Sequence, residues 1–377
     1  VAEGYIGSIL KEWDLYRERL QRRLSLSVLY LGGGTPTFFS PEELKLLMGK
    51  ITATAEIATT RSFTVEADPR VTQRAHLEVL FAHGFNEISL GVQDFDPTVQ
   101  EIVNRVHSED RIRQVTEVAR EIGFSKVNYD LIYGLPKQSL KSFNRTLDKV
   151  IELSPDRIAL YNYAHLPSRF KAQRQIIESD LPSAEERLQI FLMSVRRLLA
   201  AGYIYIGLDH FSKPDDELNK ARLDKSLHRN FQGYTTRADC DLIGFGVSAI
   251  GKVGHSYSQS VRTIKAYYEH LDAGQLPIEK GFSLTDDDVL RRQVIMELMC
   301  SGPVDFVAIN HQHGIDFRSY FADELTQLQK YEEAELIKVD AHSIQVTAKG
   351  RMFVRAVGMV FDKYLALQTG AKYSKLI

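Results

Sequence analysis

Apolar and polar residues alternate along the first two thirds of the chain in blocks that predict alternating strands and helices. Short apolar runs typical of buried strands start near Leu24, Phe63, Glu87, Lys126, Arg157 and Tyr203. Amphipathic patterns predict a helix through Tyr5–Leu20 and further helices at Thr72–His83, Ser108–Ile122, Leu140–Leu153 and Ser183–Ala201. Strand and helix recur at a spacing of about thirty residues, which indicates parallel βαβ units.

The pattern changes near Lys280. Thr285 is a predicted N-cap, and the acidic residues that follow it suit the first turn of a helix. A second helix at Phe317–Tyr331, two short strands and a last helix at Ala348–Leu367 suggest a small winged-helix-like domain. We therefore predict two domains, 1–280 and 281–377.

The apolar run that ends at Leu31 breaks into three glycines, Gly32, Gly33 and Gly34, followed by Thr35. Glycine has no Cβ, so the backbone there can turn sharply and a ligand can approach closely. Ser40 and the proline after it predict an N-cap and the start of a helix. The spacing matches neither G-x-G-x-x-G nor the P-loop, so we do not expect a phosphate cradle.

Polar residues gather at the carboxyl ends of five predicted strands. They are Gly33 and Thr35, Glu66 and Asp68, Gln93 and Asp94, Asn162 and His165, and Asp209 and His210. In a (β/α) barrel the loops that follow the strands converge at this end and form the active site. The alternative is that these residues only cap strands and form turns.

Three carboxylates are candidate site residues. Glu66 and Asp68 lie two residues apart on a strand and could face the same side, but we expect Asp68 to begin a turn while Glu66 points into the barrel. Asp130 lies in an apolar strand, and a buried acid needs a partner, for which Arg105 or a cationic ligand is a candidate.

Other polar residues leave their roles open. His165, His210 and His228 have no short spacing of the kind that metal ligands show, so we favour a non-metal role for them. Arg229 lies in a polar, aromatic stretch and could bind a substrate carboxylate in bidentate fashion. It could equally be a solvated surface charge.

Composition narrows the class of protein. The 377 residues are 44% hydrophobic and 25% charged, as in an ordinary globular protein, and a net charge of −2 gives no reason to expect nucleic acid or membrane partners. The sequence contains neither a transmembrane run nor a signal-peptide pattern, so we expect a cytoplasmic protein. Its two cysteines, Cys240 and Cys300, form no metal-binding motif.

Several segments together resemble the oxygen-independent coproporphyrinogen III oxidases, radical S-adenosylmethionine (SAM) enzymes of haem biosynthesis. The resemblance covers essentially the whole chain. It rests on LGGGTPT (31–37), VEADPR (65–70), LGVQDF (90–95), DLIYGLPKQ (130–138), YNYAHLP (161–167), GLDHF (207–211), HRNFQGYT (228–235) and QVTAKGR (345–351).

The resemblance implies a partial, open (β/α) barrel with a small C-terminal domain. It also implies oxidative decarboxylation of two propionate groups of coproporphyrinogen III, which gives protoporphyrinogen IX. In this family a 4Fe-4S cluster cleaves SAM reductively to a 5′-deoxyadenosyl radical, which abstracts a hydrogen atom from the propionate. We expect a monomer that receives electrons from a donor such as flavodoxin or ferredoxin.

The resemblance also implies roles for single residues. Gly33 and Glu66 would contact a first SAM molecule. A second SAM molecule would be lined by Gly34, Thr35, Gln93, Arg105, Asp130, Ala164 and Ile250. Asp130 suits the sulfonium or ammonium charge of this cofactor, and Arg105 suits its carboxylate.

One departure from the family concerns the cluster, which is held there by a Cys-x-x-x-Cys-x-x-Cys motif. Such a motif is missing from this sequence. Because the sequence starts at Val1 inside a helical pattern, we expect the cluster cysteines upstream of Val1 and expect a polypeptide of these residues to be inactive in radical chemistry.

Three other functions remain open. The first is a haem chaperone of the sister branch, although those relatives carry an Asn-Tyr-Trp-like segment in place of Asn-Phe-Gln-Gly-Tyr-Thr and lack Gly-Leu-Asp-His-Phe. The second is a haem-degrading radical SAM methyltransferase. The third is a non-enzymatic winged-helix scaffold, against which the carboxylates at the strand ends argue.

Overall fold

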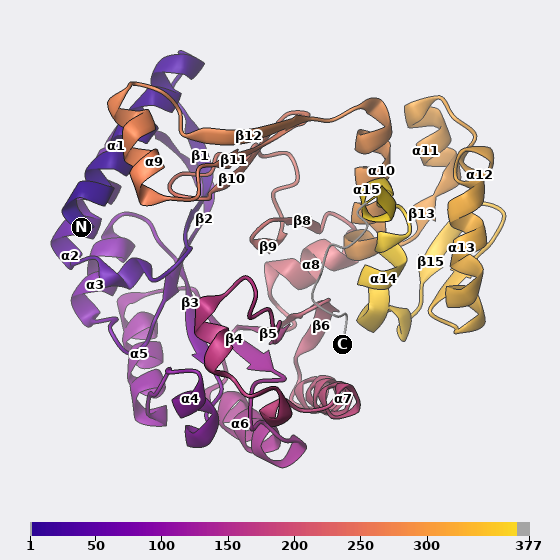
Figure 1. The fold of residues 1–377 in the computed structure, drawn as a ribbon, viewed down its shortest axis with the longest axis horizontal. Helices are drawn as coiled ribbons and strands as arrows, with labels where there is room; N and C mark the ends of the chain where they lie inside the picture. Colours follow the sequence, from indigo (N-terminus) through magenta and orange to yellow (C-terminus); the bar gives the residue numbers. More distant parts are fainter. Residues whose placement is uncertain (1, 368–377) are drawn as a thin grey trace. The chain divides into compact units, whose positions relative to one another are not determined.

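The computed structural model describes residues 2–367, and the chain divides into two units (Figure 1). The first unit holds the residues up to Tyr161 together with Glu178–Ser194 and Cys240–Ser283. The second holds Asn162–Ile177, Val195–Asp239 and the residues from Leu284 onward. Each unit is therefore built from separated stretches of the sequence.

The first unit contains parallel strands in sequence order. They are β1 (Ser25–Leu31), β2 (Glu56–Ala67), β3 (Glu87–Gln93) and β4 (Lys126–Tyr133), and β5 (Arg157–Asn162) lies next to β4. The connecting helices are α2 (Pro41–Thr54), α3 (Arg74–Ala82), α4 (Pro97–Ile102), α5 (Glu109–Ile122) and α6 (Leu140–Leu153). Figure 1 shows α2, α3 and α5 along one side of these strands. The predicted βαβ pattern is confirmed for this part of the chain.

Local sequence explains where these elements begin and which face they bury. Ser40 caps α2 in a capping box with Glu43, and Pro41 occupies the first turn, as predicted. In β4 the residues Val127, Tyr129, Leu131 and Tyr133 are buried, and they alternate with half-buried polar side chains that include Asn128 and Asp130. One face of this strand therefore packs in the core while the other presents polar groups.

The first unit also contains α1 (Ala2–Leu20), α9 (Ile264–Asp272), most of α7 (Ala184–Ala200) and an antiparallel sheet of β10 (Ile250–Val253), β11 (Ser256–Ser260) and β12 (Ile278–Ser283). Helix α1 packs against α2 and α9. Glu12 on α1 is fully buried, and its Oε2 accepts hydrogen bonds from Gly246 N (2.9 Å) and Tyr267 Oη (2.6 Å). Burial raises the pKa of Glu12 to about 7.

The second unit corrects the prediction of a single parallel strand from Tyr203 to His210. The structure has β6 (Ile204–Gly207) and β7 (His210–Ser212), which pair antiparallel. Gly207 (φ +147°) and Leu208 (φ +50°) reverse the chain between them, so Asp209 lies in the turn of a hairpin. Helix α8 (Glu217–Leu223) and a second hairpin, β8 (His228–Asn230) and β9 (Gly233–Thr235), follow.

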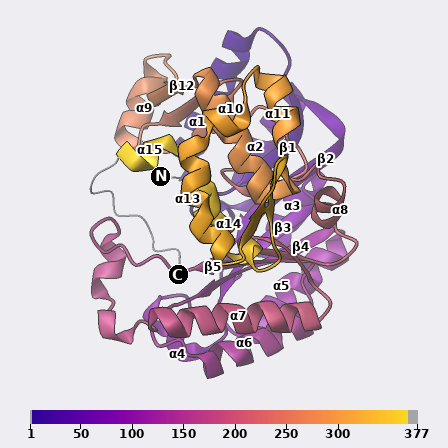
Figure 2. The same ribbon diagram turned by 90° about the vertical axis from the view of Figure 1, so that its right-hand side faces the viewer.

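The rest of this unit combines helices with a small antiparallel sheet, as expected for a winged-helix-like domain (Figure 2). The sheet has the order β13 (Val304–Asp305), β15 (Ser343–Val346), β14 (Ile337–Val339). The helices are α10 (Asp286–Met296), α11 (Phe306–His313), α12 (Phe317–Tyr320), α13 (Ala322–Glu333), α14 (Val354–Met359) and α15 (Lys363–Leu367). A π-helical turn at Glu297–Ser301 follows α10.

Two predicted helices of this domain are interrupted. The helix predicted at Phe317–Tyr331 breaks at Phe321, whose ring is fully buried in the core and whose backbone leaves the helical region (φ −106°, ψ 31°). The helix predicted at Ala348–Leu367 is a 3-10 turn followed by α14 and α15. Asp362 accepts hydrogen bonds from Tyr364 N and Leu365 N, so it starts a new helix instead of continuing the old one.

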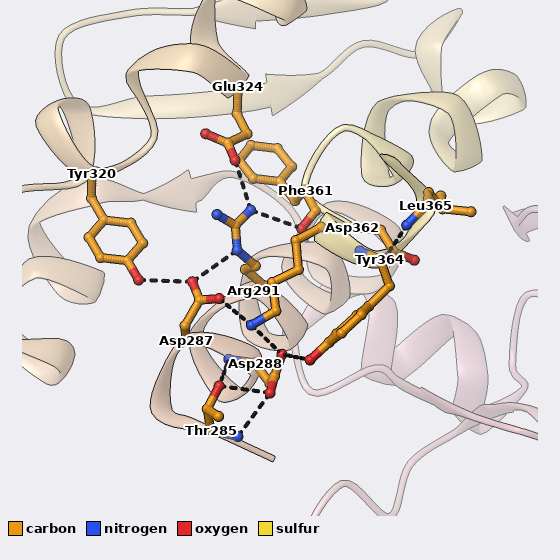
Figure 3. Close-up of polar contacts among 11 residues, drawn as sticks. Thr285, Asp287, Asp288, Arg291, Tyr320, Glu324, Phe361, Asp362, Tyr364 and Leu365 are labelled. Atoms are coloured by element: carbon orange, nitrogen blue, oxygen red, sulfur yellow. Dashed lines mark hydrogen bonds and ion pairs between the residues drawn. The ribbon is translucent and has the colours of Figure 1, made fainter. Parts of the chain in front are cut away.

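The acidic residues at the start of α10 form hydrogen bonds and ion pairs with side chains of other helices (Figure 3). Thr285 caps the helix in a capping box with Asp288, as predicted from the sequence. Lys363 Nζ lies 2.6 Å from Asp287 Oδ2 and 2.7 Å from Asp288 Oδ1. Asp287 also accepts hydrogen bonds from Arg291 and Tyr320, so these carboxylates tie α10 to α12 and α15.

Within residues 2–367 no helix has the length and apolar character needed to span a membrane.

Candidate functional site

The glycine loop after β1 contains residues with opposite surroundings. A Cβ added to Gly32 would lie 2.5 Å from Tyr30 Cε1 and 2.9 Å from Glu66 Oε1, so only glycine fits. Gly33 (φ +75°) and Gly34 (φ +94°) have left-handed backbones, and no atom lies within 4 Å of an added Cβ at either position. The loop thus packs through Gly32 and presents its next two residues to open space.

Glu66 at the end of β2 lies against this loop. Its Oε2 accepts a hydrogen bond from Gly33 N at 3.2 Å, and its Oε1 accepts one from Tyr30 Oη at 2.8 Å. Burial and then the charge of Glu66 raise the pKa of the Tyr30 hydroxyl, so Tyr30 stays a donor. As predicted, Asp68 begins a turn instead: its carboxylate pairs with Arg70 at 2.7 Å.

The side chains that form hydrogen bonds with Asp130 differ from the candidate partner predicted from the sequence, Arg105. Its carboxylate accepts hydrogen bonds from Ser89 Oγ (2.8 Å) and Asn128 Nδ2 (3.0 Å), whereas Arg105 acts on it through charge. Burial raises the pKa of Asp130 to about 6, and the charge of Glu66 contributes in the same direction. The two carboxylates are therefore close enough to influence each other, which favours a cationic ligand near them.

Gln93, next to a β-bulge, and Arg105, after α4, both lie over the glycine that faces Asp130. In the pairing of β3 with β4, Gly91 faces Asp130 and Gln93 faces Leu131, so Val92 is the extra residue. An added Cβ at Gly91 would lie 3.0 Å from Gln93 Nε2 and 3.3 Å from Arg105 Nη1, so both side chains pass over this glycine. Gln93 has φ +65°, and its Oε1 is buried without a hydrogen-bond partner.

Asp94, also expected at the site, has a structural role. Its side chain is buried, and it accepts hydrogen bonds from Gln138 Nε2 (2.6 Å) and from the hydroxyl of Thr146. These bonds hold the loop after β3 against the start of α6. Gln93 and Asp94 are consecutive residues, and side chains of consecutive residues point to opposite faces of an extended strand, so the two have different surroundings.

The remaining predicted cofactor residues lie in different parts of the fold. Thr35 precedes a short 3-10 turn (Pro36–Phe38), but its side chain makes no capping hydrogen bond there. Ile250 begins β10 in the first unit and is 36% exposed. Ala164 belongs to the second unit, where its carbonyl accepts a hydrogen bond from Gln173 Nε2 at 3.0 Å.

Arg229 is half-buried and packs against an aromatic ring, which favours the interpretation as a binding residue over that as a solvated surface charge. Its guanidinium lies 5.0 Å from the centroid of the Tyr234 ring, in cation–π contact. Its Nη1 is buried and has no hydrogen-bond partner. A buried N–H group without an acceptor is costly, so this arrangement suits an anionic ligand.

Sequence reasoning missed Tyr30, Ser89 and Asn128, which hold the two carboxylates. A signal was present for one of them: Asn128 lies two residues before Asp130, so both residues occupy the same face of β4. The positions of Tyr30 and Ser89 depend on register between strands, which the sequence of one strand does not contain.

A metal site does not form among the residues that the structure describes. From residue 2 to residue 367, no three His, Cys, Asp or Glu side chains are grouped so that they could hold a metal ion. Cys300 is buried, and burial raises the pKa of its thiol to about 12, away from the thiolate that an iron–sulfur cluster requires. These residues therefore do not fit a 4Fe-4S cluster.

Comparisons with known proteins agree with this geometry. Residues 11–150 match the Radical SAM superfamily, and residues 284–353 match the HemN C-terminal domain. The oxygen-independent coproporphyrinogen III oxidase of Pseudomonas aeruginosa is 44% identical over 99% of this chain and 82% of its own length. The enzyme of that name from Escherichia coli is 43% identical over 97% of this chain and 79% of its own length.

A solved structure is also similar. The coproporphyrinogen III oxidase (HemN) from Escherichia coli, described as a radical SAM enzyme, superposes with a TM-score of 0.93 over 96% of this chain and 83% of that one. The agreement covers the partial (β/α) barrel of radical SAM type and the small C-terminal domain. The radical SAM superfamily implies SAM and a 4Fe-4S cluster as cofactors. This chain belongs to the oxygen-independent coproporphyrinogen III oxidase family.

Proposed function

We propose that this chain binds SAM and coproporphyrinogen III and serves the oxygen-independent oxidative decarboxylation of two propionate groups to vinyl groups, which gives protoporphyrinogen IX. The observation that carries this proposal is the hydrogen bond between Glu66 at the end of β2 and Gly33 after β1, with the buried Asp130 on β4 of the same sheet, in a chain of this family. Bound SAM supplies the 5′-deoxyadenosyl group that the reaction consumes.

The first SAM molecule would lie at Gly33 and Glu66. Gly33 offers an open approach because its added Cβ would meet no atom within 4 Å. Glu66 has one carboxylate oxygen on Gly33 N and the other on Tyr30 Oη, so its orientation is fixed before the ligand binds. An oriented carboxylate beside an open backbone suits the positively charged amino group of the cofactor.

The second SAM molecule would be bound by Gly34, Thr35, Gln93, Arg105, Asp130, Ala164 and Ile250. The charges of this set match the cofactor, since Asp130 complements the sulfonium or ammonium group and Arg105 complements the carboxylate. The buried Gln93 Oε1 without a partner supports the same assignment, because such an acceptor needs a donor from a ligand. Ionised Asp130 is disfavoured without a ligand and favoured once a cation binds.

Arg229 would bind a carboxylate of the tetrapyrrole substrate. Its unpartnered Nη1 supports this role, since guanidinium groups bind carboxylates in a bidentate manner. The role of this residue is orientation of the substrate, not chemistry at the reacting carbon.

The cluster sets a limit on the chemistry of these residues alone. No ligands for a cluster occur among residues 2–367. We therefore assign to these residues the binding of SAM and the orientation of the substrate, and no part in electron transfer. We predict that a polypeptide of this sequence, incubated with SAM and dithionite, forms no 5′-deoxyadenosine. Detection of that product by liquid chromatography would contradict the prediction.

Further assignments remain predictions: the division into domains 1–280 and 281–377, a monomeric state, a flavodoxin or ferredoxin as electron donor, and a cytoplasmic location. The match of residues 284–353 to the HemN C-terminal domain supports a domain that begins near residue 281.

Calorimetric titration with SAM tests the proposed function. We expect binding by the wild-type chain and a loss of about tenfold or more in affinity for Glu66→Gln, because a hydrogen bond to a charged group contributes about 1.5–3 kcal/mol. Glu56→Gln is the matched control, since Glu56 begins the same strand and is exposed. Absence of SAM binding by the folded wild-type chain, or equal affinity of Glu66→Gln, would refute the assignment.

A further inference from the structure

We propose that four arginines of the second unit, Arg222, Arg229, Arg351 and Arg355, form a binding site for several carboxylate groups of the substrate. We call these residues the arginine cluster. Two of its members, Arg351 and Arg355, come from the C-terminal domain, so this domain would recognise the substrate directly. The identity of the ligand rests on the proposed function; the anionic character of the ligand rests on the geometry alone.

Arg229 packs on an aromatic ring that is itself held in place. The ring of Tyr234, over which it lies, is fixed by a hydrogen bond from Tyr234 Oη to Met299 O (3.0 Å) and by edge contact with the His210 ring at 5.4 Å. Met299 belongs to the π-helical turn after α10, where the helix ladder is irregular. Such turns are frequent at functional sites. The guanidinium thus lies over a fixed ring, and its buried Nη1 has no hydrogen-bond partner.

Arg355 shares a carboxylate with Arg229. Arg355 Nη2 lies 3.7 Å from Asp209 Oδ2, too far for a hydrogen bond, and its side chain is 45% exposed. The charges of both arginines act on Asp209, whose pKa burial raises. One carboxylate at this distance leaves the N–H groups of Arg355 available to a ligand.

The other two members add positive charge and are oriented by hydrogen bonds. Arg351 Nη1 donates to Ile206 O at 3.1 Å, and Arg222 Nη2 donates to Asn219 Oδ1 at 2.9 Å. Arg351 lies near enough to Arg222 to contribute, after burial, to lowering the pKa of that guanidinium. A ligand with more than one negative charge would offset the positive charge that these arginines gather.

Coproporphyrinogen III fits this requirement because it carries four propionate groups, of which the reaction removes two. The two that persist are available as anchors throughout the reaction. Guanidinium groups match carboxylates in geometry as well as charge, so they would select an acidic tetrapyrrole over an uncharged one. An uncharged analogue would leave the buried Arg229 N–H unpaired and would bind weakly.

The experiment uses the full chain and two air-stable probes, coproporphyrin III and its tetramethyl ester, in a fluorescence titration. We expect the wild type to bind the free acid at least about tenfold more tightly than the ester. Arg229→Gln and Arg355→Gln should each lower affinity for the acid by about tenfold and leave the ester unchanged. Arg318→Gln removes an exposed arginine of the same unit and serves as the matched control.

The outcomes separate this inference from the proposed function. Tight binding of the acid that neither substitution weakens, or equal binding of acid and ester, overturns the inference and leaves the proposed function standing. Absence of coproporphyrin binding by wild-type chain that still binds SAM refutes the proposed substrate itself. If Arg229→Gln does not fold, the half-exposed Arg355→Gln decides alone, and Arg355→Lys should recover part of the affinity because it restores the charge.

Discussion

Replacing Gly32 with alanine should disturb the glycine loop without adding a charge or a polar group. The added Cβ would lie 2.5 Å from Tyr30 Cε1, whereas ordinary contacts begin at 3.4 Å, so the ring must move by about 0.9 Å. The same Cβ would lie 2.9 Å from Glu66 Oε1 and push the carboxylate away. The hydrogen bond between Glu66 and Gly33 N is already 3.2 Å long and would break.

We expect Gly32→Ala to lower stability by about 1–3 kcal/mol, the usual cost of overpacking, and to lower affinity for SAM by about tenfold or more. Thermal unfolding and calorimetric titration measure the two effects. Gly7→Ala is the control, because an added Cβ at this exposed position in α1 meets no atom within 4 Å. In a Tyr30→Val background the substitution should cost less, since the clashing ring is gone.

Two results would refute this prediction. One is that Gly32→Ala unfolds at the same temperature as the wild type and binds SAM with the same affinity. The other is that the substitution costs the same stability in the Tyr30→Val background. Either result would mean that Tyr30, Gly32 and Glu66 do not pack as described.

Two further predictions concern charged groups. Because burial raises the pKa of Asp130 from 3.8 to about 6, the stability of the unliganded chain should fall as pH rises through this interval, while affinity for SAM should rise. Asp130→Asn should remove the pH dependence of SAM affinity and reduce that of stability, of which the part due to Glu12 remains. Melting and titration series across this pH range measure both effects, and unchanged pH profiles would contradict the prediction. Lys363→Gln should destabilise the second unit by about 2 kcal/mol, because Asp288 is nearly buried, whereas the exposed Lys338→Gln should have no effect in the same denaturant titrations. Burial alone would raise the pKa of Asp288, but the ammonium of Lys363 holds this pKa below its ordinary value. The difference in stability between the wild type and Lys363→Gln should therefore shrink in acid, and a difference that grows in acid would refute the assignment.

The sequence was sufficient for features that depend on local patterns. The strand that ends at the glycine loop, the cap at Ser40 and the turn at Asp68 follow from residue types within a few positions of one another. The carboxylates at the strand ends followed from the rule that parallel strands place their carboxyl ends together. For these features, local preference and tertiary structure agree.

Features that depend on distant contacts could not be predicted. The break at Phe321 arises because the core of the C-terminal domain takes up its ring, although the surrounding residues favour a helix. The partners of Asp130 come from two strands whose register includes a bulge, which shifts which side chains are neighbours. The apolar residues from Tyr203 to Ile206 predict a strand that continues through Gly207, whereas the positive φ angles of Gly207 and Leu208 reverse the chain there.

The buried carboxylate of Glu12 has a consequence for how the chain folds during synthesis. Its hydrogen-bond donors, Gly246 N and Tyr267 Oη, lie 234 and 255 residues later in the sequence. At about 5–20 residues per second, Tyr267 emerges from the ribosome roughly 10 to 50 s after Glu12. During this interval α1 has no closed pocket for that carboxylate and exposes the apolar face that it later buries against α9. Helix α1 is thus secured only after the last segments of the first unit have been made.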